Sequence, residues 1–124
     1  MIRARDLLEV AETCADRDEE PWIRTAIGRF YYAALLASRE YCEDHLGYVR
    51  TRLGREHAEV PRLLVHNSTD IADQLLFLRS IRNAADYDLH LSIATMHRNL
   101  DDGRELARMI IARLDELTET TVPR

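Results

Sequence analysis

Apolar residues recur every three or four positions along most of the chain, the spacing that places them on one face of an α-helix. The sequence holds only four glycines, and no window alternates apolar and polar residues for long enough to predict a β-strand. Its 124 residues suffice for one domain with a single core. The pattern therefore predicts an all-α fold in one domain, residues 1–124.

Breaks in the apolar pattern divide the chain into about five predicted helices. Pro21 stands where a first helical turn accepts proline, and Gly47 is placed to end the helix that follows. Residues 67–70 supply several candidate N-caps for a later helix. The predicted helices cover residues 2 to about 16, 21–47, about 60–66, 71–90 and 93–118, with a basic, polar connection over 48–59 and a frayed tail over 118–124.

The helix predicted over residues 71–90 carries charges on the face that should be buried. Arg82 and Asp86 fall inside its apolar stripe, one helical turn apart. Because burying a lone charge is costly, these side chains must pair, face a wet cleft or lie at a subunit boundary. The simplest interpretation is a structural ion pair between Arg82 and Asp86 beside an ordinary solvated surface. The stripe contains Ile71, Leu75, Leu78, Ile81, Ala85 and Leu89, and the adjoining face contains Arg79, Asn83, Tyr87 and His90.

The last predicted helix has a strict apolar seam, which is typical of a helix that packs in a bundle or across a dimer. A charged residue, Arg29, also occupies apolar surroundings within residues 21–47, which we expect to form the central buried helix. The seam of the last helix consists of Ile93, Met96, Leu100, Gly103, Ala107, Ile110, Leu114 and Leu117.

The charged residues limit the kinds of molecule that the protein is expected to bind. The formal net charge of −5 argues against broad non-specific binding to nucleic acid, but it leaves room for a local basic groove. The sequence has no lysine, which excludes lysine nucleophiles, Schiff bases and the lysine-containing phosphate loop. Any phosphate or carboxylate must be bound by arginine, whose planar guanidinium group suits bidentate contacts.

The sequence predicts no cofactor, no metal and no contact with a membrane. It contains neither a glycine-rich phosphate loop nor a metal-ligand spacing such as H-E-x-x-H. Cys14 and Cys42 stand alone, so we expect both to be reduced core residues. No run of about 18 apolar residues occurs, and the first residues resemble a helix start rather than a signal peptide. We therefore expect a cytoplasmic protein.

Two segments together resemble the HEPN domain family. Residues 24–39, RTAIGRFYYAALLASR, are similar to the arginine, aromatic and Tyr-Ala pattern of the family's second helix. Residues 79–89, RSIRNAADYDL, are similar to the arginine followed by Ala-Asp-Tyr on its fourth helix. The resemblance implies an up-and-down helical bundle, commonly a homodimer in which the fourth-helix motifs of two subunits face one cleft. Arg82 would then line that cleft.

Many members of this family are metal-independent endoribonucleases that act as toxins, in phage defence or beside CRISPR systems, and others occur with a small nucleotidyltransferase. The catalytic members carry an arginine, a polar residue and then a histidine about four to six residues further on. Arg82 and Asn83 match the first two positions, but Tyr87 replaces the histidine and His90 lies further along. The resemblance thus implies Arg82, Asn83 and His90 as catalytic residues and Arg29, Arg79 and Tyr87 as RNA- or phosphate-binding residues.

Cleaving RNA without a metal requires a base for the 2′-hydroxyl proton, an acid for the leaving oxygen and a cation near the phosphate. Arg82 could supply the cation and Asn83 could orient the phosphate. Tyr87 is a poor base because the pKa of tyrosine is about 10, whereas His90 titrates in the useful range. His57 corresponds to a histidine in the family's third-helix segment, and its role there is left open between structural, cleft-lining and catalytic.

Two hypotheses remain. In the first, an RNA-directed HEPN-like protein of toxin–antitoxin or defence type binds or cleaves RNA in a cleft between two subunits. In the second, a non-catalytic dimeric module docks on a nucleotidyltransferase or another effector, and its Arg-Asp-Tyr cluster holds the bundle together. The missing histidine and the acidic balance favour the module, whereas Arg82, Asn83 and the arginine-rich connection favour RNA.

Overall fold

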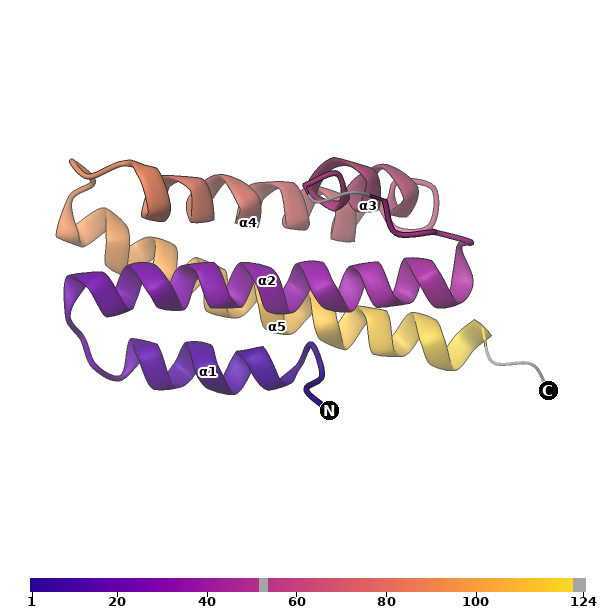
Figure 1. The fold of residues 1–124 in the computed structure, drawn as a ribbon, viewed down its shortest axis with the longest axis horizontal. Helices are drawn as coiled ribbons and strands as arrows, with labels where there is room; N and C mark the ends of the chain where they lie inside the picture. The colour runs from indigo at the N-terminus through magenta and orange to yellow at the C-terminus, as the bar shows by residue number, and fades with distance from the viewer. Residues whose placement is uncertain (52–53, 122–124) are drawn as a thin grey trace.

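The structure, a computed structural model, describes residues 1–51 and 54–121. Helices α1, α2, α4 and α5 run in alternating directions along the bundle, and the short helix α3 lies beside one end of α4 (Figure 1). Within the described residues there is no strand, so the predicted all-α fold of about five helices is confirmed. The helices are α1 (Asp6–Ala15), α2 (Glu20–His45), α3 (Glu56–Leu64), α4 (Thr69–Tyr87) and α5 (Ile93–Thr121).

Helix α2 is the centre of the bundle, as predicted. It packs against all four other helices. Its apolar middle places Phe30, Tyr31 and Leu35 in the core, where each residue is at most 1% exposed. Pro21 lies in its first turn, where the missing N–H has no helical partner to lose. Cys42 of α2 and Cys14 of α1 are buried free thiols, and burial raises the pKa of Cys42 to about 11. Cys42 is therefore protonated at neutral pH.

Helix α4 starts earlier and ends earlier than predicted. Ser68, one of the candidate N-caps, accepts a hydrogen bond from the Ile71 amide at 3.3 Å. The helix ends at Tyr87 because Asp88 adopts an extended conformation and its carboxylate accepts the backbone N–H of His90 at 3.0 Å. Leu89 therefore lies outside the helix and is 78% exposed, so its predicted place on the buried stripe is wrong.

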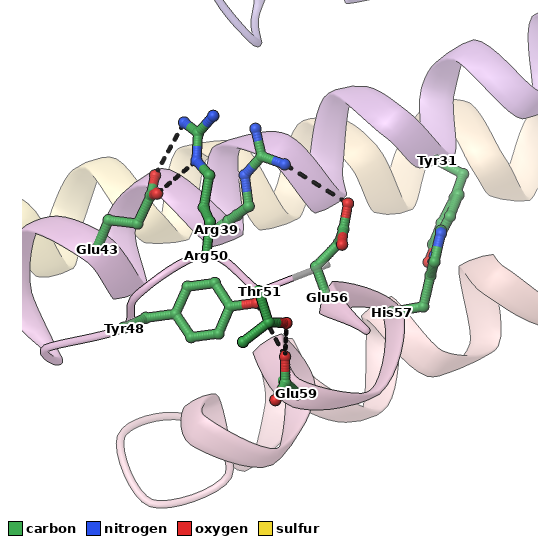
Figure 2. Close-up of polar contacts among 9 residues, drawn as sticks. All are labelled: Tyr31, Arg39, Glu43, Tyr48, Arg50, Thr51, Glu56, His57 and Glu59. Atoms are coloured by element: carbon green, nitrogen blue, oxygen red, sulfur yellow. Dashed lines mark hydrogen bonds and ion pairs between the residues drawn. The ribbon is translucent and has the colours of Figure 1, made fainter. Parts of the chain in front are cut away.

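Helix α3 begins at Glu56, four residues before the predicted start, and Pro61 lies inside it rather than near its beginning. The residues of the predicted polar connection, 48–59, are held by contacts among themselves and by contacts from α2. Arg39 of α2 lies 3.5 Å from the Glu56 carboxylate, and Tyr48 and Thr51 both donate to Glu59 Oε1, at 3.2 and 2.8 Å (Figure 2). These partners satisfy the two carboxylates of the first turn of α3, where negative charge also suits the helix dipole.

The two terminal helices also differ from the prediction at their ends. Helix α1 begins at Asp6 rather than Ile2, because the Asp6 carboxylate accepts the Arg3 amide at 2.7 Å and closes a turn ahead of the helix. Helix α5 continues through Thr121, so residues 118–121 of the predicted frayed tail are helical, and 122–124 lie outside the described residues. Its predicted seam is largely buried from Met96 to Leu114, but Ile93 in the first turn is 52% exposed.

Gly103 of α5 offers a clean test of how α4 packs on α5. A Cβ added at Gly103 would lie 3.5 Å from Ile81 Cδ1 and 3.6 Å from Leu78 Cδ1, which are ordinary van der Waals distances. Because glycine inside a helix costs about 0.5–1 kcal/mol relative to alanine, Gly103→Ala should raise the free energy of unfolding by about that amount. Urea unfolding followed by circular dichroism measures the change.

The control for this prediction is Gly103→Leu, which overfills the same space and should lower the free energy of unfolding by about 1–3 kcal/mol. A loss of stability in Gly103→Ala would contradict the observed distance between α4 and α5.

Among the residues that the structure describes, no helix combines the length and the apolar character needed to cross a bilayer.

Candidate functional site

Arg82 projects from α4 toward α2 and is held by three neighbours. Its Nη2 donates to the Tyr32 hydroxyl at 3.0 Å and its Nη1 donates to Asn83 Oδ1 at 2.9 Å. Its Nε lies 2.9 Å from Asp86 Oδ2, so the structure contains the ion pair expected from the spacing of Arg82 and Asp86. Only 16% of the Arg82 side chain is exposed, against 36% for Asp86. The guanidinium group is therefore fixed between α4 and α2.

Tyr31, Tyr32 and His57 form an aromatic group beside Arg82. The Tyr31 hydroxyl and His57 Nδ1 are 2.6 Å apart, and their rings are nearly parallel with centroids 5.6 Å apart (Figure 2). The Tyr32 ring meets both at an edge, with centroids 5.3 Å from Tyr31 and 5.9 Å from His57. Arg82 lies 5.3 Å from the Tyr32 ring centroid, within the range of a cation–π contact. Helices α2, α3 and α4 thus meet at one site.

Burial and charge set the protonation of this site. Burial raises the pKa of the Tyr31 hydroxyl far above its usual value, although Arg79 and Arg82 act in the opposite direction. Burial, followed by the nearby Arg79 and Arg82 charges, lowers the pKa of His57 below the usual 6.5. At neutral pH, therefore, Tyr31 is a neutral phenol and His57 a neutral imidazole. A neutral imidazole has one ring nitrogen able to accept a proton.

Arg29 and Arg79 complete the site, and no carboxylate of the described residues forms an ion pair with either side chain. Both side chains are half-buried, and within residues 1–51 and 54–121 neither makes a hydrogen bond or an ion pair. The Arg29 guanidinium group lies 5.2 Å from the Tyr32 ring centroid. We call Arg29, Tyr31, Tyr32, His57, Arg79, Arg82, Asn83 and Asp86 the arginine–tyrosine cluster.

The lack of a counter-ion at Arg29 and Arg79 is unusual within this chain. The other four half-buried arginines of the described segments are each paired with a carboxylate: Arg24 with Glu20 at 3.1 Å, Arg39 with Glu56 at 3.5 Å, Arg82 with Asp86 at 2.9 Å and Arg104 with Glu12 at 2.8 Å. A half-buried guanidinium group that lacks such a partner is poorly solvated and attracts an anion from outside the chain.

Tyr87 and His90 do not join the cluster. Tyr87 is the last residue of α4 and is 74% exposed, and His90 is exposed in the connection to α5. Within the described part of the chain, the hydrogen bond that His90 makes stays in its own turn, from its backbone N–H to the Asp88 carboxylate. Helix α4 ends three residues before His90, where the sequence predicted that it would continue, and the assignment of His90 to catalysis stays a prediction.

The histidine that the structure brings to Arg82 is His57, whose role the sequence left open. Its helix was predicted to begin after it, so no local pattern placed the imidazole on a defined face. The signal in the sequence was the neighbouring pair Tyr31 and Tyr32, two hydroxyl groups in an otherwise apolar run. A buried hydroxyl needs a hydrogen-bond partner, and His57 and Arg82 are those partners.

No group of three or more histidine, cysteine, aspartate or glutamate residues in the described segments is placed to hold a metal ion. The cluster itself contains one carboxylate and one imidazole among three guanidinium groups. The cluster therefore combines an excess of positive charge with an imidazole that is neutral at pH 7.

Comparison of the chain with protein-family models, with curated proteins and with solved structures finds no match.

Proposed function

We propose that the chain is a HEPN-like domain that binds single-stranded RNA through the arginine–tyrosine cluster and cleaves it without a metal. The observation that carries the proposal is the pair of half-buried arginines, Arg29 and Arg79, without a counter-ion among the described residues. A phosphodiester supplies that counter-ion. Arginine binds phosphate through a rigid fork of N–H donors, and hydrogen bonds to charged groups are about twice as strong as neutral ones.

The neighbouring groups fit the chemistry of RNA cleavage. His57 is neutral at pH 7 and acts as the base that takes the 2′-hydroxyl proton. Arg79 supplies charge for the phosphate as negative charge builds in the transition state, and Arg82 adds to that field from its fixed position. Asn83 retains its amide N–H donors, because its oxygen is the atom bonded to Arg82. A single strand can present its 2′-hydroxyl group in line for this reaction.

The resemblance to the HEPN family supports a homodimer in which two copies of the cluster face one cleft. The proton that His57 takes from the 2′-hydroxyl group passes to water, and the leaving 5′-oxygen takes a proton from water, so the step balances with the groups of one cluster. Light scattering on a sizing column tests for the dimer by giving the mass in solution.

Arg79→Ala tests the binding function. A fluorescent single-stranded RNA is titrated with protein in excess EDTA, and its anisotropy is measured. Loss of one charge-assisted contact, worth about 1.5 kcal/mol, should raise the Kd about tenfold. Arg98→Ala is the matched control because Arg98 is an exposed arginine on α5 without an ion pair among the described residues. Equal Kd values for wild type, Arg79→Ala and Arg98→Ala would contradict the proposal.

A second candidate function is a non-catalytic dimeric module that docks on a nucleotidyltransferase-type partner. The observation that favours it is the position of Arg82, whose donors are directed at Tyr32 and Asn83 within the chain. An arginine used in this way holds α4 on α2. Failure of the wild-type protein to bind or cleave RNA, with a folded dimer in solution, would favour this module.

A further inference from the structure

A second concentration of arginines lies along α2, beside the arginine–tyrosine cluster. A cleft of about 790 Å³ opens between the first residues of the chain, α2 and the connection that follows it. Among the described residues that line this cleft, four are arginines, Arg3, Arg29, Arg39 and Arg50, and one is a carboxylate, Glu40. The chain as a whole carries a net charge of −5, so this α2 cleft is a local basic surface on an acidic protein.

The four arginines differ in how firmly they are paired. The side chains of Arg3 and Arg29 make no ion pair within the described residues. Arg39 reaches Glu56 at 3.5 Å, but its Nε is buried without a hydrogen-bond partner in the described structure. Arg50 is bound to Glu43 at 2.6 Å, which fixes it beside Arg39 (Figure 2). The cleft therefore combines unpaired charge with donors held in place.

Arg29 connects the α2 cleft to the arginine–tyrosine cluster. Its guanidinium group lies over Tyr32, which accepts the hydrogen bond from Arg82, and the same arginine lines the cleft. Arg29 and Arg39 are ten residues apart on α2, or about 15 Å along the helix axis. One phosphate group cannot contact both. At a rise of about 3.4 Å per stacked nucleotide, this distance corresponds to about four nucleotides.

We propose that the α2 cleft continues the RNA site, so that the phosphates next to the one bound at the cluster lie along α2 between Arg29 and Arg50. The inference rests on the proposed function, because it needs RNA at the cluster. It adds to that function the length of RNA that is bound and the path that the strand takes away from the cluster. Leu7 and Leu36 line the same cleft and provide apolar surface for the bases.

The test compares two lengths of RNA. A labelled trinucleotide is long enough for the cluster alone, whereas a labelled decanucleotide covers the cluster and the cleft. The double variant Arg3→Ser/Arg50→Ser removes one unpaired and one paired arginine from the cleft. The control, Arg98→Ser/Arg113→Ser, removes one unpaired and one paired arginine from α5, where Arg113 is bound to Glu116 at 3.0 Å. Both variants change the net charge equally, and circular dichroism verifies that both are folded.

We expect the cleft variant to bind the decanucleotide about tenfold more weakly and the trinucleotide within twofold of wild type. Its salt dependence should also fall: losing two phosphate contacts on a single strand lowers the slope of log K against log salt concentration by about 1.4. The control variant should change neither affinity nor slope. These results together support the path along α2.

Two outcomes would overturn the inference in distinguishable ways. If Arg79→Ala weakens both lengths but the cleft variant binds the decanucleotide as wild type does, or no more weakly than the control, RNA binds the cluster and does not extend into the cleft. If Arg79→Ala weakens neither length, the proposed RNA function itself is wrong and the inference falls with it.

Discussion

His57→Ala should lower the rate of RNA cleavage by about 10²–10⁴-fold, the usual loss when a positioned general base is removed. The reason is geometric as well as chemical: Tyr31 holds the imidazole at 2.6 Å, and the site keeps it neutral at pH 7. Single-turnover cleavage of a labelled RNA in excess EDTA measures the rate. Binding of the RNA should change much less, because His57 carries no charge at that pH.

The matched control is His90→Ala, which removes the histidine that the sequence assigned to catalysis. Since His90 is exposed and its side chain makes no hydrogen bond or ion pair with the described part of the cluster, its loss should leave the rate within about twofold. A large loss in His90→Ala with no loss in His57→Ala would refute the assignment of the base.

The pH dependence of the cleavage rate shows whether the surroundings of His57 raise or lower its pKa. A base works when deprotonated, so the rate should fall as the pH drops through the pKa of His57, and that acid limb should lie below pH 6.5. Arg79→Ala removes one of the charges that lower this pKa and should move the limb to higher pH. The pH at half-maximal rate distinguishes His57 from a histidine in water.

Arg82→Ala should lower the free energy of unfolding by about 2–3 kcal/mol. The substitution removes hydrogen bonds to Tyr32 and Asn83 and leaves Asp86 without its cation. The cost stays below the 3–5 kcal/mol of a fully buried pair because Asp86 is 36% exposed and water can solvate it. Urea unfolding at neutral pH measures the change.

Two further variants isolate the contact that Arg82 makes across the bundle. Arg82→Lys keeps the charge but cannot contact Tyr32, Asn83 and Asp86 at once. Its free energy of unfolding should therefore lie between those of the wild type and Arg82→Ala. A double-mutant cycle of Arg82→Ala with Tyr32→Phe should give a coupling of about 1 kcal/mol. Arg113→Ala, at an exposed pair on α5, should change stability by less than about 0.5 kcal/mol. An Arg82→Ala protein as stable as Arg113→Ala would contradict the structural role of Arg82.

Local patterns predicted the parts of this fold that depend on near neighbours in sequence. The cap at Ser68 and the pairing of Arg82 with Asp86 each lie within about one helical turn, and the buried seam of α5 repeats a spacing of three or four residues. Helical periodicity describes such features directly.

The rest of the site depends on contacts between residues far apart in the chain. Tyr31 and His57 are 26 residues apart, and Tyr32 and Arg82 are 50 apart. No spacing rule relates positions on different helices. The sequence therefore indicated Arg82, Asn83 and the partner Asp86 on the same helix, but not the partners on α2 and α3. The end of α4 was predicted too late for a different reason: helical periodicity was extended past Tyr87 to His90, whereas the turn at Asp88 ends the helix.

The shortness of α3 has a consequence for the chemistry of His57. Its nine residues fall below the roughly 12–15 that an isolated helix needs in water, so α2 and α4 must stabilise it. Segments of this kind open locally, at a lower free energy than the whole domain unfolds. Each such opening carries the imidazole away from Arg82 and Tyr31. The amide exchange rates of α3 therefore report how much of the time His57 lies beside Arg82 and Tyr31, the position that the proposed reaction requires.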